Sequence, residues 1–165
     1  MRTLTISAIS LVLFAFVISG CKKDKKETPT PTPALTKTQM ITAKPWKVTA
    51  VTVSPAIDWD GQGTMVTDIY SQMDACEKDD LVKFNTNGSY TLEEGTSVCV
   101  TGDPQVYETG TWAFNSNETA LTITPSGSTV YSYDIVSLSS TTLTYNEIYN
   151  DGTTNYTYTV TMTAQ

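Results

Sequence analysis

The chain has 165 residues, with ten Lys and Arg against seventeen Asp and Glu, three cysteines and no histidine. This length has room for one domain, and the net charge of −7, without a stripe of basic residues, excludes binding to the phosphate backbone of a nucleic acid. The lack of histidine removes the commonest general base and the commonest zinc ligand, so the composition favours a binding or structural protein over an enzyme.

Residues 1–20 have the layout of a secretory signal peptide. Arg2 is followed by an apolar run from Leu4 to Ile18, which is too short to span a bilayer comfortably. The run ends in Ile18-Ser19-Gly20-Cys21, which resembles the lipobox of bacterial lipoproteins, where the cysteine is acylated before cleavage. We therefore expect the mature chain to begin at a lipidated Cys21. The alternative, a transmembrane anchor with an incidental cysteine, fits the short run less well.

Residues 21–34 are predicted to form a tether. Lys22-Lys23-Asp24-Lys25-Lys26-Glu27 is followed by Thr28-Pro29-Thr30-Pro31-Thr32-Pro33, and charge with alternating proline gives an extended, solvated spacer. The lysines either keep the spacer soluble or attract anionic headgroups. The sequence thus predicts a protein of the cell envelope that partners a membrane through its lipid anchor. We expect this to be the outer membrane, on its periplasmic or its surface side.

Residues 35–165 are predicted to form the folded domain. A short helix over Leu35–Ala43, capped by Thr36 or Thr38, ends before Pro45. Beyond it the apolar residues recur with a period of two, in short segments rich in Thr, Val and Tyr that are separated by turn residues. The predicted strands cover residues 46–53, 81–85, 89–93, 107–114, 120–124, 129–138, 142–149 and 155–163.

Eight consecutive strands joined by short turns predict an all-β fold, an antiparallel up-and-down barrel in which the last strand pairs with the first. Asn87-Gly88 is the strongest hairpin signal, because both residues tolerate the positive φ of a primed turn. The last strand shows the cleanest alternation, with Tyr156, Tyr158, Val160 and Met162 on one face. A two-sheet sandwich is the alternative fold.

Cys76 and Cys99 remain as an even pair in an exported, oxidising setting once Cys21 is committed to lipid. We expect a disulfide between them, with two buried free thiols as the alternative. Their spacing is far from Cys-x-x-Cys, so a redox role is not indicated.

The segment Ser54–Asp80 is far longer than a hairpin requires, and we interpret it as a lid over the open end of the barrel. Thr67 is predicted to cap a short helix within it. The apolar side chains of this lid are the candidate ligand contacts, namely Trp59, Met65, Ile69, Tyr70 and Met73.

The same segment contains Asp58-Trp59-Asp60-Gly61-Gln62-Gly63, which is similar to the start of a calcium-binding loop. Alternate oxygen ligands surround the ion in such loops, so the candidate ligands are Asp58, Asp60, Gln62 and Asp68. Gln62 occupies a position where a stronger ligand is usual. Asp68 falls at the eleventh position of the loop, whereas such loops usually have a bidentate Glu at the twelfth. An acidic, glycine-rich surface loop is the simpler interpretation, and the sequence implies no other cofactor.

Four short sequence segments resemble parts of the lipocalin-like domains of small envelope lipoproteins of Gram-negative bacteria. The resemblance extends from Thr42 to Gln165. The segments are Trp46-Lys47-Val48, Asp74-Ala75-Cys76-Glu77-Lys78-Asp79-Asp80, Phe84-Asn85-Thr86-Asn87-Gly88-Ser89-Tyr90 and Glu108-Thr109-Gly110-Thr111-Trp112-Ala113-Phe114. These segments contain turn residues and core aromatic residues, so the resemblance implies a fold and does not indicate a ligand or a reaction. True lipocalins open with Gly-x-Trp and close with an arginine stacked on that tryptophan, whereas Lys44-Pro45-Trp46 keeps only the tryptophan and no arginine follows Arg2.

A small barrel has an interior that side chains fill or that holds one small ligand. The sequence therefore favours a non-enzymatic, membrane-anchored envelope lipoprotein whose barrel binds a small apolar or amphipathic ligand. The alternative is a structural lipoprotein with a filled barrel, whose acidic outer surface or lid contacts another envelope protein.

Overall fold

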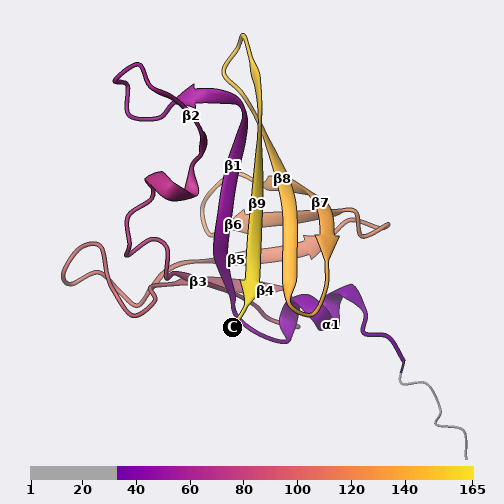
Figure 1. The fold of residues 1–165 in the computed structure, drawn as a ribbon. Helices are drawn as coiled ribbons and strands as arrows, with labels where there is room; N and C mark the ends of the chain where they lie inside the picture. Colours follow the sequence, from indigo (N-terminus) through magenta and orange to yellow (C-terminus); the bar gives the residue numbers. More distant parts are fainter. Residues whose placement is uncertain (1–32) are drawn as a thin grey trace, which may run out of the picture. The chain divides into compact units, whose positions relative to one another are not determined.

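The computed structural model describes residues 33–165, so the predicted signal peptide, Cys21 and nearly all of the tether lie outside the described residues. No helix among the described residues is long and apolar enough to cross a membrane. Within this range a helix and nine strands follow one another (Figure 1). They are α1 (Lys37–Thr42), β1 (Trp46–Asp58), β2 (Met65–Asp68), β3 (Leu81–Phe84), β4 (Ser89–Glu93), β5 (Val106–Phe114), β6 (Ala120–Pro125), β7 (Tyr131–Leu138), β8 (Thr142–Asn150) and β9 (Asn155–Ala164).

Eight of these strands form a closed antiparallel barrel. The order is β1-β3-β4-β5-β6-β7-β8-β9, and each strand pairs with the next. The barrel closes because β9 runs beside β1 from Trp46↔Ala164 to Ser54↔Thr157, as Figure 1 shows. The predicted eight-stranded up-and-down barrel is thus confirmed, and its last strand, β9, pairs on both sides, with β8 and with β1.

The ninth strand, β2, corrects the sequence interpretation of the long connection. β3 pairs with β1 only at Trp46↔Val82 and Lys47↔Leu81. Beyond that point β1 has an unpaired edge, and it continues to Asp58 instead of ending at residue 53 because β2 pairs with it there. Thr67 therefore lies in a strand and caps no helix. The only helical turn of this segment is η1 (Tyr70–Gln72), which has no side-chain cap.

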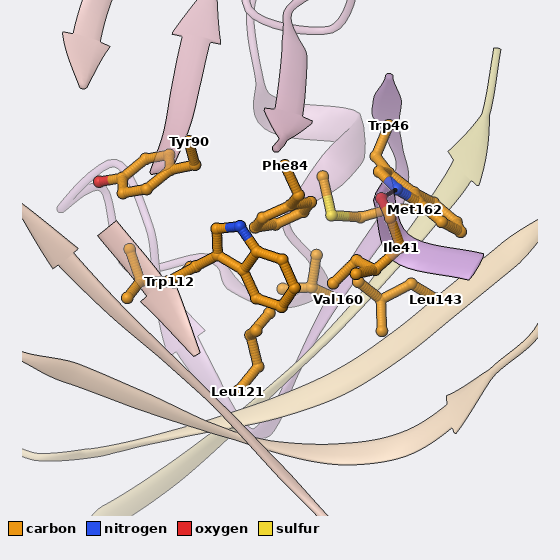
Figure 2. Close-up of a cluster of buried hydrophobic side chains, with 10 residues drawn as sticks. Ile41, Trp46, Phe84, Tyr90, Trp112, Leu121, Leu143, Val160 and Met162 are labelled. Atoms are coloured by element: carbon orange, nitrogen blue, oxygen red, sulfur yellow. Dashed lines mark hydrogen bonds between the residues drawn. The ribbon is translucent and has the colours of Figure 1, made fainter. Parts of the chain in front are cut away.

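Helix α1 lies across one end of the barrel (Figure 1). Of the two predicted caps, Thr36 is the one used: its side chain accepts a hydrogen bond from the Gln39 backbone, and the Gln39 side chain accepts one from the Thr36 backbone. The helix places Ile41, which is fully buried, over the barrel end. The Trp46 indole donates to the Ile41 carbonyl oxygen at 2.7 Å, which fixes helix and strand together (Figure 2).

The core fills the barrel next to α1 (Figure 2). Its aromatic rings meet edge to face, with centroids 5.5 Å apart for Phe84 and Trp112. The Trp112 indole donates to the Asn85 carbonyl oxygen at 3.0 Å, so the one polar group of that ring is satisfied. The buried cluster consists of Ile41, Trp46, Phe84, Tyr90, Trp112, Leu121, Ile123, Leu143, Val160 and Met162. This cluster is the solid core of the barrel.

Candidate ligand-binding cavity

A cavity of about 130 Å³ lies inside the barrel and is partly open to solvent. Five of its lining residues, namely Phe84, Tyr90, Leu121, Ile123 and Met162, also belong to the buried cluster. Alternate residues of antiparallel strands face inward, which brings side chains from seven strands together here. Nine of the ten lining residues are apolar or aromatic. They are Val82 and Phe84 from β3, Tyr90 and Leu92 from β4, Glu108 from β5, Leu121 and Ile123 from β6, Tyr133 from β7, Tyr145 from β8 and Met162 from β9.

Glu108 is the carboxyl group in the cavity wall. The Tyr90 hydroxyl donates to Glu108 Oε1 at 2.6 Å, and burial together with this bond raises the pKa of Tyr90. Gly110 makes this arrangement possible: a Cβ there would meet Thr124 O at 2.3 Å and Tyr90 Cε1 at 2.6 Å. The bare backbone of β5 thus lets the Tyr90 ring lie flat against it and reach Glu108.

Two tyrosines form the opposite wall. The rings of Tyr133 and Tyr145 have centroids 4.9 Å apart and are tilted by 45°. Burial raises the pKa of Tyr133 to about 12, with the nearby Glu147 carboxyl as the next cause, and it raises the pKa of Tyr145 as well. Both hydroxyls stay protonated at physiological pH and are available as hydrogen-bond donors.

Glu147 lies beyond Tyr145 on the same inward face of β8. It is directly opposite Tyr158 of β9, and the register Asp134↔Asn146 brings it beside Tyr133 of β7. Glu147 is half-buried, and burial raises its pKa. Glu147 thus adjoins the cavity residues Tyr133 and Tyr145 without itself lining the cavity.

A wider recess of about 590 Å³ adjoins the cavity. The two share Glu108, Ile123 and Tyr133, and the recess adds Tyr107 and Tyr131 at its rim. The recess is lined by residues of β5, β6 and β7, and it meets the cavity at the three shared side chains.

The predicted lid residues lie elsewhere, because none of the five is among the residues that line the cavity. Trp59 and Met65 are 48% and 61% exposed, and Tyr70 and Met73 are half-buried. Ile69 is buried, and its backbone N–H donates to the Val51 carbonyl oxygen at 2.9 Å, which extends the β1–β2 pairing by one residue. This part of the segment is a piece of the barrel wall beside β1.

The predicted calcium ligands do not converge. Asp58 accepts from the Gly63 backbone N–H at 2.9 Å, Asp60 from that of Gln62 at 3.0 Å, and Asp68 from that of Ser71 at 3.1 Å. Each carboxylate thus stabilises its own turn, and among residues 33–165 no three Asp, Glu, Cys or His side chains gather as a metal site. In this structure the segment is thus an acidic surface loop, and the calcium assignment stays a prediction.

The predicted disulfide is present, with the Cα atoms of Cys76 and Cys99 5.2 Å apart. It joins the loop before β3 to the loop after β4. Asp79 ties the same two loops, because its carboxylate accepts hydrogen bonds from the backbone N–H and hydroxyl groups of Thr96 and Ser97. These bonds, with the Thr96 hydroxyl first, lower the pKa of Asp79 to about 2. The corner of the barrel next to the cavity is therefore doubly fixed.

Comparison with protein families matches residues 42–145 to the lipocalin-like domain. Among solved structures, a complex of bovine odorant binding protein with a selenium-containing odorant is 14% identical, covers 82% of this chain and 77% of that chain, and has a TM-score of 0.41. A second odorant binding protein is 7% identical, with coverages of 81% and 77% and a TM-score of 0.38. The search of curated proteins found no match. At these TM-scores the structural likenesses support no inference about a ligand.

Proposed function

The chain belongs to the lipocalin-like domain family, and we propose that its barrel binds one small apolar or amphipathic molecule, without catalysis. The observation that carries the proposal is the interior cavity of about 130 Å³. An apolar cavity of about 150 Å³ is known to stay dry and to take up benzene, so this volume suits a ligand of about the same size. Hydrogen-bonding groups at one edge, beside an apolar wall, are the usual composition of a small-molecule site.

The test is a titration of the lipid-free protein (Cys21→Ser) with 1-hexanol, followed by amide chemical shifts. Burying the six-carbon chain at about 0.8 kcal/mol per methylene predicts a Kd on the order of 1 mM. The shifts are expected at cavity residues such as Leu121, Ile123 and Tyr133, and little change is expected at Trp59 or Met65 on the outer segment.

A filling variant separates cavity binding from surface binding. Val82→Phe places a ring in the cavity and is expected to weaken hexanol binding about tenfold. The matched control is Val136→Phe, because Val136 is 58% exposed on β7 and does not line the cavity. Equal binding to both variants, or saturable shifts confined to the outer surface, contradicts the proposal.

We further propose that Cys21 carries a lipid that anchors the domain to the envelope membrane. The support is the Ile18-Ser19-Gly20-Cys21 sequence and the charged, proline-rich stretch that follows it. In cells fed labelled palmitate, the wild-type chain is expected to incorporate label and to fractionate with outer membranes. Cys21→Ser is expected to lose both properties, whereas Cys76→Ser/Cys99→Ser keeps them; label that remains on Cys21→Ser contradicts this assignment.

A further inference from the structure

The ionisable groups that line the cavity and the adjoining recess are acidic or phenolic, and the other polar groups of the recess are the neutral hydroxyls of Thr109, Ser126 and Ser128. Glu108 lines the cavity, and Glu147 follows Tyr145 on the inward face of β8. Residues 33–165 contain five lysines and no arginine, and none of these lysines lines the cavity or the adjoining recess. An incoming ligand therefore meets negative charge and aromatic faces, with no positive group among them.

Tyr133 lines the cavity together with Glu108, and the β7–β8 register places it beside Glu147. After burial, the causes that raise its pKa include both Glu147 and Glu108, so the phenol is within electrostatic reach of each. Its ring is also paired with that of Tyr145 at 4.9 Å. The negative face of an aromatic ring attracts a cation within about 6 Å of its centroid, and the attraction grows when water is excluded.

Neither carboxyl group has a cationic partner within the described part of the chain, where the one ion pair joins Lys83 to Glu93. Glu147 is half-buried without such a partner, and burial raises its pKa because the ionised form is poorly solvated there. A cation beside Glu147 would stabilise that ionised form, whereas a second anion would destabilise it further.

We propose that the cavity selects a small organic cation, an alkylammonium whose apolar tail of about six carbons enters the cavity. The ammonium group then lies at the cavity edge among Tyr133, Glu108 and Glu147. This inference rests on the proposed binding function and adds the charge class of the ligand. A fatty acid with the same tail would bring its carboxylate against two like charges.

The experiment compares three ligands with the same tail on the lipid-free protein: hexylammonium, 1-hexanol and hexanoate. Hexylammonium is expected to bind about tenfold or more tighter than hexanoate, with hexanol between them. If hexanol binds but hexanoate equals or exceeds hexylammonium, the charge selection is refuted and the proposed binding function stands. If none of the three binds, the binding function itself is refuted.

Two variants test whether Glu147 is responsible for the preference for a cationic ligand. Glu147→Gln is expected to weaken hexylammonium binding about fivefold and to leave hexanol unchanged. The matched control is Asp134→Asn, which removes the same charge from an exposed, outward-facing position one residue from Tyr133. The control is expected to change neither affinity. An equal loss of hexylammonium binding in both variants would show that net charge, rather than the cavity edge, is responsible, and it would overturn the proposal.

Discussion

The effect of the Cys76–Cys99 disulfide on the free energy of unfolding follows directly from the length of the loop that it closes. Cys76 and Cys99 are 23 residues apart in sequence, and the chain-entropy relation gives about 3 kcal/mol for closing a loop of that length. Cys76→Ser/Cys99→Ser is therefore expected to lower the free energy of unfolding by about 3 kcal/mol and the melting temperature by about 10 °C. The measurement is urea unfolding followed by fluorescence of the buried Trp46 and Trp112.

Reductant provides the internal control for this variant. It is expected to destabilise the wild-type protein by the same amount and to leave the double variant unchanged. The Asp79 hydrogen bonds to Thr96 and Ser97 remain after reduction, so the native loops are expected to keep their positions and the cavity to keep its hexanol affinity. A loss of stability below about 1 kcal/mol would refute the reasoning, because the bridge would then constrain little of the unfolded chain.

Three further substitutions test the core at Leu143, the cavity wall at Gly110 and the buried carboxyl group of Glu94. Leu143→Ala empties a fully buried site in the solid core and is expected to cost about 3 kcal/mol in urea unfolding. Gly110→Ala forces a Cβ to within 2.3 Å of the Thr124 carbonyl oxygen, so it is expected to destabilise the barrel and to weaken hexanol binding together. Glu94 has a buried carboxylate oxygen without a hydrogen-bond partner, and burial, followed by the charge of Asp80, raises its pKa. The folded state then binds the proton more tightly than the unfolded chain, so stability falls as pH rises through the interval between the unfolded and folded pKa of Glu94. Glu94→Gln is expected to remove that slope and to raise the urea midpoint at neutral pH; a midpoint that falls would count against this assignment.

The barrel was predictable because its signals are local. Strands alternate with a period of two whatever their partners, and the run from Tyr156 to Met162 shows this without interruption. A hairpin forms at Asn87-Gly88 as predicted, with Gly88 at a φ of 82°, where glycine is unstrained. Asn87 does not share the positive φ, so the turn is not the predicted primed turn. Each of these features depends on neighbouring residues only.

The ninth strand was not predictable for the opposite reason. β2 exists because β3 leaves the edge of β1 unpaired after Lys47, and that depends on the register of two distant segments. Met65 and Ile69 look alike in sequence as apolar lid residues. The register exposes the first and buries the second against the backbone of β1.

The cavity residues were missed because they come from seven strands, and only the register between those strands brings them together. One signal was present in the sequence: Leu143, Tyr145 and Glu147 alternate along β8, so a carboxyl group follows two core residues on the inward face. Such a break in the apolar face marks the level where the core ends and the cavity edge begins.

The central claim, that a small molecule binds inside the barrel, is tested most directly by intermolecular NOEs from bound 1-hexanol. Binding inside the barrel predicts NOEs from the hexanol methyl group to Leu121, Ile123 and Met162 in the cavity wall. NOEs only to exposed residues such as Trp59 and Met65, with none to the cavity wall, would contradict it.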